Sequence, residues 1–270
     1  MKYSITVSKS KSKFPPIVFQ GNLEKNLILI KKLGFSGVEF SEINPEKINI
    51  SELANLLEKT GLVVSAFGSA RLFIENKLSF TNPDKFIRKI TVNKIREISR
   101  IAKIFNSPVI IGLVRGNKLK DDIRLSERII CECLEECMHY AGTDSASFLL
   151  EPINKNEIDI FNKLEDTALF LNEYKNRLDP QRIGILADVF HMNIEEAEIS
   201  ETIKKYHALI KYIHFADSNR LAPGDGNIDF SKIMDVLKMI DYNSFISFEF
   251  LSSSNSNINA SKAIKFITSL

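Results

Sequence analysis

The stretch IGILADVFHMNIEEAEISETIKKYHALIKYIHF, residues 183–215, contains a strand, a helix and a second strand in succession. Its first six residues are almost all apolar and have the length of a buried strand, and residues 212–215 form a similar run. Between them, residues 199–209 place apolar side chains at the three- and four-residue spacing of a helix. This order predicts two parallel strands joined by a crossover helix.

The same alternation of short apolar runs and longer helical segments extends over the rest of the chain. Further strands are predicted at residues 3–7, 37–40, 63–67, 108–112, 147–151 and 245–249, and further helices at residues 23–33, 51–60, 83–105, 125–141, 160–174, 231–240 and 261–269. Eight strand–helix units with no linker between them predict one α/β domain spanning residues 1–270. Their number and size are those of a closed (β/α)8 barrel, the TIM-barrel fold.

Glycines and polar residues mark several of the predicted helix ends. Gly34 and Gly61 stand where a left-handed residue commonly ends a helix. Ser51 is predicted to cap the helix at 51–60, and Asn82 the helix at 83–105. An open, doubly wound sheet is the alternative architecture. The segment GFSG at 34–37 lacks the glycine spacing of a dinucleotide-binding turn and precedes its strand, which favours the barrel.

The overall composition predicts a cytoplasmic protein that binds neither nucleic acid nor membrane. Its net charge of +2 arises from scattered lysines, and no apolar run is long enough to cross a membrane. The first residues, MKYSITVSKSKSK, lack the apolar segment of a signal peptide. The three cysteines, Cys131, Cys133 and Cys137, lie in one predicted helix and match no zinc-binding spacing, so we expect buried, unreactive thiols.

Four ionisable residues follow one another at the ends of successive predicted strands: Glu151, Asp188, His214 and Glu249. The carboxyl ends of all strands of such a barrel meet on one face, where active sites lie. Three carboxylates and an imidazole converging there would repel one another unless a cation neutralised them. The oxygen-rich set suits a divalent ion such as Mn²⁺, Mg²⁺ or Co²⁺ better than structural zinc.

At these residues the sequence resembles the D-tagatose 3-epimerase (ketose 3-epimerase) family of xylose-isomerase-like TIM barrels. The resemblance covers nearly the whole chain and rests on four ordered motifs: EPINKNE at 151–157, DVFHMN at 188–193, HFADSNR at 214–220 and PGDG at 223–226. It implies a metal-dependent sugar epimerase that inverts carbon 3 of a ketose or keto-sugar acid through a cis-enediolate. It also implies one divalent ion, Mn²⁺ above all, a small sugar as substrate, and a homo-oligomer.

The resemblance further implies a role for each site residue. Glu151 and Glu249 are expected to ligate the metal and to act in turn as base and acid on opposite faces of the substrate. Asp188 and His214 are expected to complete the metal's ligands. Three further residues, Glu157, His191 and Arg220, correspond to positions that bind and orient the substrate hydroxyls.

Two further features bear on the substrate. The stretch IIGLVRG at 110–116 resembles a branch of the family acting on keto-sugar acids such as ketogluconates, in which Arg115 would pair with a substrate carboxylate. A solvated loop arginine is the other interpretation of Arg115. The polar loop after the first strand, SKSKSKFPPIVFQGN at 8–22, is expected to contribute to substrate access as a lid or to be a plain surface loop.

Three other functions remain open at this point. An aldose–ketose isomerase of the same superfamily would use a similar site to move a proton between carbons 1 and 2. An apurinic-site DNA endonuclease would hold a histidine-rich zinc cluster, whereas this chain has four histidines in all. A sugar-binding protein without catalysis would not need paired carboxylates beside a metal.

Overall fold

The computed structural model describes residues 1–13, 15–42, 44–139, 146–251 and 255–270. Its strands are β1 (Lys2–Ser8), β2 (Phe19–Gln20), β3 (Gly37–Ser41), β4 (Val63–Gly68), β5 (Val109–Ile111), β6 (Phe148–Leu150), β7 (Ile183–Asp188), β8 (Ile210–Phe215) and β9 (Phe245–Phe248). Its helices are α1 (Leu23–Lys32), α2 (Ile50–Thr60), α3 (Ala70–Asn76), α4 (Lys85–Ile104), α5 (Ile123–His139), α6 (Leu164–Glu173), α7 (Val189–Glu195), α8 (Ile199–Tyr206), α9 (Phe230–Met239) and α10 (Ser256–Thr268), with short 3-10 turns at Pro45–Lys47 (η1) and Leu113–Arg115 (η2).

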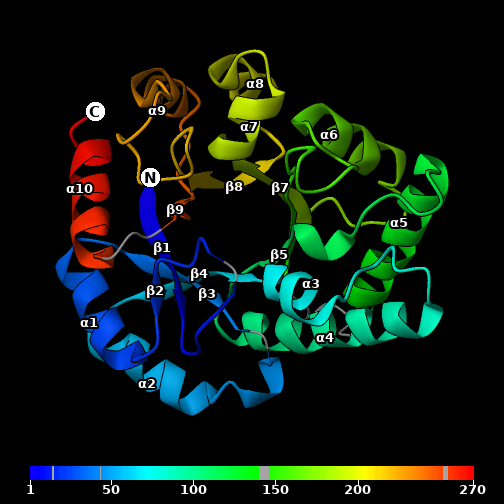
Figure 1. The fold of residues 1–270 in the computed structure, drawn as a ribbon, viewed down its shortest axis with the longest axis horizontal. Helices are drawn as coiled ribbons and strands as arrows, with labels where there is room; N and C mark the ends of the chain where they lie inside the picture. The colour runs from blue at the N-terminus through cyan, green and yellow to red at the C-terminus, as the bar shows by residue number, and fades with distance from the viewer. Residues whose placement is uncertain (14, 43, 140–145, 252–254) are drawn as a thin grey trace.

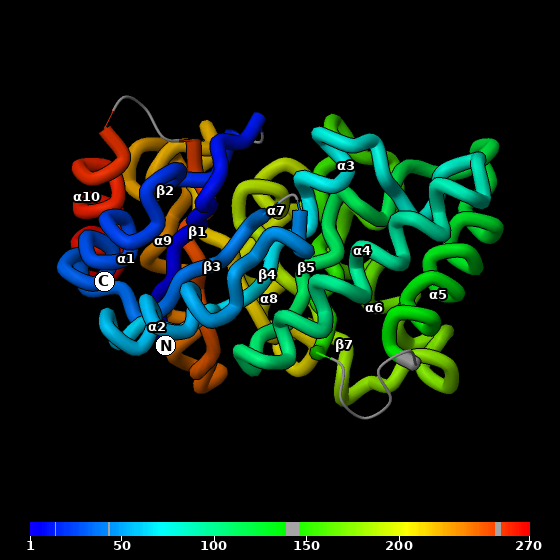
Figure 2. The backbone as a smooth tube through the Cα atoms, turned by 90° about the horizontal axis from the view of Figure 1, so that it is seen from below, coloured from blue at the N-terminus to red at the C-terminus, as the bar shows by residue number. Residues whose placement is uncertain are grey.

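The strands form a closed parallel barrel, as the sequence predicts. Strands β1, β3, β4, β5, β6, β7, β8 and β9 pair in that order, and β9 pairs back with β1. The two-residue strand β2 is an addition that pairs with the end of β1. Helices surround the strands on the outside (Figure 1). Seen from the side, α3 lies at the upper edge of the barrel and the N-terminus at the opposite edge (Figure 2).

The period-two alternation of the strands sorts their side chains between two cores. Side chains that point outward, such as Ile213, Phe215 and Phe248, belong to the large core shared with the helices. Side chains that point inward form a smaller cluster within the barrel: Ala66, Ile110, Leu149, Leu186 and Tyr212. Three of the predicted metal ligands, Glu151, Asp188 and His214, lie two residues after the inward-pointing Leu149, Leu186 and Tyr212. Because the side chains of a strand alternate, these ligands point into the barrel as well.

The predicted elements are confirmed with small shifts at their ends. Gly61 has φ 63° and ends α2, and Gly34 has φ 98° just after α1. The two predicted N-caps are wrong: the side chain of Asn49 caps α2 and that of Asp84 caps α4. Ser, Asn and Asp side chains can all accept a hydrogen bond from the free N–H groups of a helix's first turn. A neighbouring residue of these types can therefore form the cap in place of the predicted one. The predicted end of α5 at Ala141 lies outside the described residues.

Two helices were not predicted, and both lie on the side of the active-site face. Helices α3 and α7 directly follow β4 and β7. Each is seven residues long, which is too short for a clear helical period.

The three cysteines lie buried on α5, as expected. Burial raises the pKa of the Cys131 thiol to about 11 and that of Cys133 to about 12, and it also raises the pKa of Cys137. Within the described residues, no helix combines the length and the apolar character needed to cross a bilayer.

Candidate metal centre and active site

The four predicted metal ligands meet at the carboxyl ends of four neighbouring strands. Glu151 and Glu249 follow β6 and β9 directly, Asp188 ends β7, and His214 is the penultimate residue of β8. One ligand atom of each lies within 4.8 Å of those of the others, and all four side chains are buried. Four side chains from segments up to about 100 residues apart therefore converge on one point.

The imidazole of His214 has one satisfied and one unsatisfied nitrogen. Its Nε2 lies 2.8 Å from a carboxylate oxygen of Glu39, a residue of β3. Its Nδ1 is buried and has no hydrogen-bond partner. That atom instead faces carboxylate oxygens of Glu151 at 3.4 Å, Asp188 at 3.6 Å and Glu249 at 3.7 Å. The distances exceed those of hydrogen bonds but leave the four groups around a common centre.

The electrostatics of the cluster call for a cation. Burial raises the pKa of Glu249 well above its usual value, and the nearby carboxylate of Glu151 raises it further. Burial opposes the charged form of His214, but the carboxylates of Glu39 and Glu249 outweigh it and raise the His214 pKa well above 6.5. Without a metal, these groups retain protons to offset the crowded negative charge. The orphaned Nδ1 and three carboxylates fit a divalent ion, which would replace those protons.

The predicted substrate-binding residues lie next to the cluster and contact one another. An Nη atom of Arg220 lies 2.7 Å from Glu157, and the other Nη lies 3.6 Å from Glu249. The Arg220 guanidinium also stacks over the ring of Phe190 at 4.8 Å. His191 is buried, with its Nε2 3.7 Å from Asp188. Glu157, His191 and Arg220 all line the pocket that contains Glu151, His214 and Glu249.

Residues 27–270 match the family model described as "Xylose isomerase-like TIM barrel". The chain belongs to this family. Members with named activities include an L-ribulose 3-epimerase of Mesorhizobium japonicum, 27% identical to this chain over 90% of its length and 80% of the relative's. A 3-dehydro-D-guloside 4-epimerase of Escherichia coli is 24% identical over 86% of this chain and 88% of the relative.

A solved structure of the family has a very similar fold. The apo form of an Escherichia coli 3-keto-D-glucoside 4-epimerase superposes with a TM-score of 0.83 at 18% identity, over the full length of both chains. The predicted membership in the xylose-isomerase-like barrels is thereby confirmed. The finer prediction of a keto-sugar-acid branch stays a prediction.

The loop that presents Arg220 is organised by Asp217, a residue of the motif HFADSNR for which the sequence predicted no separate role. The Asp217 side chain is buried and accepts hydrogen bonds from the backbone N–H groups of Ser218, Gly224 and Ile228. Arg220 itself has φ 59°, in the left-handed region, and its N–H donates to the Asp217 carbonyl at 2.7 Å. The motif HFADSNR thus contains one residue that shapes the loop and another that reaches the pocket.

Gly112 is a second residue that the sequence did not mark. It follows β5 and lies against the Glu151 carboxylate, so closely that a Cβ at this position would collide with Glu151 Oε2. The same Cβ would lie 3.2 Å from Ile153. The close approach of the Glu151 carboxylate therefore requires a residue without a Cβ at this position.

Arg115 does not reach the rim, so both interpretations made from the sequence need correction. Its side chain is 1% exposed. Its guanidinium donates to four backbone carbonyls, those of Gly112, Glu151, Ile160 and Phe161, at 2.6 to 3.3 Å. Since these bonds occupy the guanidinium and bury it, Arg115 fixes the backbone beside Glu151 instead of contacting a substrate or solvent. Burial lowers its pKa to about 10.

A small apolar cluster contributes Ile17, Leu113 and Ile153 to the lining of the pocket. Its buried members are Ile17, Leu113, Ile153 and Ile158, with Ala70, Phe73 and Ile74 of α3 packed against them. The free space in the pocket is about 20 Å³, enough for an ion or one water molecule but far below that of a sugar site.

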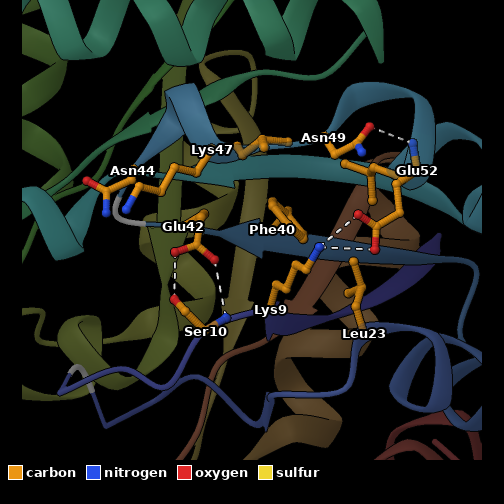
Figure 3. A pocket seen from close by; sticks show the side chains of 11 residues that line it. Lys9, Ser10, Leu23, Phe40, Glu42, Asn44, Lys47, Asn49 and Glu52 are labelled. Carbon is orange, nitrogen blue, oxygen red and sulfur yellow. Dashed lines mark hydrogen bonds and ion pairs between the residues drawn. The ribbon is translucent and has the colours of Figure 1, made fainter.

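The loop after β1 carries Ile17 and is fastened to α3. Arg71 of α3, 1% exposed, donates to Ser8, Ser10 and the carbonyl of Lys11. A separate hollow of about 330 Å³ is lined by residues of this loop, of β3 and of α2, among them Phe40 (Figure 3). Lys9 and Glu52 form an ion pair at 2.8 Å across it (Figure 3). None of the predicted site residues lines this hollow.

Proposed function

We propose that this protein is a metal-dependent sugar epimerase that inverts the carbon next to a carbonyl group. The observation that carries the proposal is the pair of buried carboxylates, Glu151 and Glu249, within the four-residue cluster that could hold a metal ion. Inversion requires one group to remove a proton from the carbon and another to return a proton to the opposite face. A centre built only to bind sugar would not need two such carboxylates.

The chain's own residues supply the acid–base chemistry and the orientation. A bound divalent ion, Mn²⁺ in our proposal, with Mg²⁺ and Co²⁺ as alternatives, would polarise the substrate oxygens and stabilise the enediolate charge. Glu151 and Glu249 would exchange the proton on the two faces of the reacting carbon. Asp188 and His214 would hold the ion with them.

Residues beyond the metal ligands would orient the sugar. Arg220 and Glu157 lie together beside Glu249, where they offer a donor and an acceptor for hydroxyl groups. His191 is held by the side-chain amide of Asn154 at 2.7 Å from its Nδ1, which leaves Nε2 directed toward the cluster. The apolar cluster in the lining of the pocket would exclude water from the enediolate.

The named relatives invert different carbons, but each of these carbons is next to a carbonyl group. In a 2-ketose, carbon 3 is next to the carbonyl; in a 3-dehydro sugar, carbon 4 is. By their names, an L-ribulose 3-epimerase and a 3-dehydro-D-guloside 4-epimerase therefore both act beside a carbonyl. Two glutamates at a metal centre would support the same chemistry in this protein. We propose a free ketose or keto-sugar acid inverted at carbon 3 as the substrate, with a 3-keto glycoside as the second candidate.

The test is proton exchange in D₂O. Chelator-treated protein is reloaded with Mn²⁺ and incubated with ketopentoses, ketohexoses, ketogluconates and 3-keto glucosides, and products are followed by NMR. We expect an epimer carrying deuterium at the inverted carbon. Deuterium confined to carbon 1, with an aldose as product, would identify an aldose–ketose isomerase instead. No exchange with any of these compounds would contradict both enzymatic functions.

The endonuclease alternative has no comparable support in the site. In the part of the chain that the structure describes, the cluster able to hold a metal contains a single histidine, His214. Cleavage of an apurinic-site oligonucleotide in the same metal-loaded preparation would contradict the epimerase proposal.

A further inference from the structure

We infer that Glu39 is a positioning residue of the metal centre, which fixes the His214 ring so that Nδ1 rather than Nε2 binds the ion. The inference rests on the metal centre proposed above. It adds a fifth residue, from a strand on which the sequence marks no site. Glu39 would not touch the metal or the substrate and would act through His214.

The placement of Glu39 follows from the alternation of β3. Its neighbours Val38 and Phe40 point outward into the core shared with the helices, so the Glu39 side chain points into the barrel. There it is 3% exposed and lies 2.8 Å from Nε2 of His214 on β8. The contact joins two residues 175 positions apart in the chain.

The barrel interior leaves room for this carboxylate. The residues paired with Glu39 on the adjacent strands are Thr6 of β1 and Ala66 of β4, both small. The ring of Tyr212 lies against His214 from the other side, with centroids 5.7 Å apart and nearly perpendicular planes. The Tyr212 hydroxyl is itself held by Ser65 at 2.6 Å and Ser4 at 3.2 Å. These contacts restrict the rotation of the His214 ring.

The hydrogen bond between Glu39 and His214 determines which nitrogen of the His214 ring carries the proton. An ionised carboxylate only accepts hydrogen bonds, so a hydrogen bond to Glu39 requires a proton on Nε2. A neutral imidazole then carries its lone pair on Nδ1, the nitrogen that faces Glu151, Asp188 and Glu249. Carboxylates that hold the second nitrogen of a metal-binding histidine raise its basicity and orient its ring, and their loss typically weakens metal binding 10- to 100-fold.

The experiment compares Glu39→Leu, Glu39→Gln and a control, Ser107→Ala, with the wild type. Leucine removes the acceptor, whereas the glutamine amide oxygen still accepts from Nε2. Ser107→Ala removes a buried hydroxyl whose hydrogen bonds go to the carbonyls of Val64 and Phe105 rather than to Tyr212 or His214. Mn²⁺ affinity is measured by the EPR signal of free Mn²⁺ after chelator treatment. The His214 tautomer is read from ¹H–¹⁵N couplings of ¹⁵N-histidine-labelled protein loaded with diamagnetic Mg²⁺ or Zn²⁺.

We expect the metal-loaded wild type to show a proton on Nε2 of His214. The Mn²⁺ dissociation constant should rise 10- to 100-fold in Glu39→Leu, less in Glu39→Gln, and remain unchanged in Ser107→Ala. A metal-loaded wild type with the proton on Nδ1 would overturn the inference, even if Glu39→Leu does not fold. Equal Mn²⁺ affinity of folded Glu39→Leu and wild type would overturn it too, while leaving the metal centre intact. Failure of the wild type to bind any divalent ion would overturn both proposals.

Discussion

At the scale of the residue, the site depends on the placement of single carboxylates. Glu151 and Glu249 are buried and lie on the same cluster as Asp188 and His214. Their environment differs, because Glu249 also lies 3.6 Å from Arg220, whereas Glu151 lies against Gly112. Two predictions follow from these contacts.

The first concerns Glu249→Gln. Glutamine keeps the shape of the side chain but cannot carry a proton between the two faces of the substrate, so we expect turnover to fall about 10²–10⁴-fold or more. Turnover is measured by NMR, and circular dichroism checks that the fold is retained. Glu52→Gln, an exposed change outside the site, should leave turnover unaltered. Substantial turnover in Glu249→Gln would remove Glu249 from the mechanism.

The second concerns Gly112→Ala. The added Cβ would occupy the space of the Glu151 carboxylate and push it away from the metal centre. We expect both Mn²⁺ affinity and turnover to fall at least about tenfold, the usual minimum when a metal-site support is lost. Thermal unfolding monitors stability, which should change far less. Wild-type affinity in this variant would mean that Glu151 adapts without cost.

At the scale of the element, two buried arginines hold the loops that surround the pocket. Arg71 on α3 holds the loop after β1, and Arg115 at the end of η2 holds the segment after β6. Both interact with backbone or side chains from other elements. We therefore infer that both arginines fix the geometry of these loops. Substitution of the two is expected to have different effects.

Replacing Arg71 with Met should loosen the loop after β1. It removes hydrogen bonds to Ser8, Ser10 and Lys11 and the 2.7 Å ion pair with Glu75, which lowers the Glu75 pKa against the effect of burial. We expect faster tryptic cleavage at residues 11–13 and a KM that rises more than kcat falls. Lys9→Met removes only the exposed pair with Glu52 on the same loop and should change little. Equal rates of tryptic cleavage in the two variants would contradict the proposal that Arg71 holds the loop after β1.

Replacing Arg115 with Met should destabilise the whole fold. The carbonyls of Glu151, Ile160 and Phe161 would lose their donor in a buried environment. Since each buried group left unsatisfied costs about 1–3 kcal/mol, we expect the free energy of unfolding to fall by about 3 kcal/mol or more. Urea denaturation measures it. Unchanged stability together with a loss of turnover would instead restore a direct role in catalysis.

At the scale of the whole molecule, the barrel brings charges from distant strands into one buried cluster. This gathering sets a pH dependence for metal binding. Glu249 and His214 have raised pKa values without a metal, so both retain protons in a range where isolated groups would lose them. A metal ion must displace those protons when it binds.

Mn²⁺ affinity should therefore increase as the pH rises from about 6 to about 8, because fewer protons remain to be displaced. Calorimetry in buffers of different ionisation enthalpy should show a net release of protons on binding at neutral pH. Affinity that is independent of pH, with no proton release, would contradict the protonation pattern of the metal-free cluster. The predicted homo-oligomer is tested separately by light scattering.

The sequence by itself determined the repeating units and the four candidate metal ligands at the strand ends. Strands such as residues 183–188 are recognisable from local apolar runs, and in a parallel barrel every such strand ends on the same face. Asp188 and Glu249 could therefore be assigned from their positions alone. The motifs around Glu157, His191 and Arg220 added the residues beside the cluster, although their individual roles remain predictions.

Only the tertiary structure decided the positions of Glu39, Gly112 and Asp217 and the partners of Arg71 and Arg115. In the sequence Glu39 is an isolated charged residue in a predicted strand. Its partner His214 lies 175 residues away in the chain, and the two meet only in the closed barrel. Arg115 was expected at the rim, but the backbone of residues 151–161 folds around its guanidinium. The physical reason is common to all of them. Apolar periodicity is a local property of the chain, whereas the partner of a buried polar group is chosen by contacts that exist only after the barrel closes.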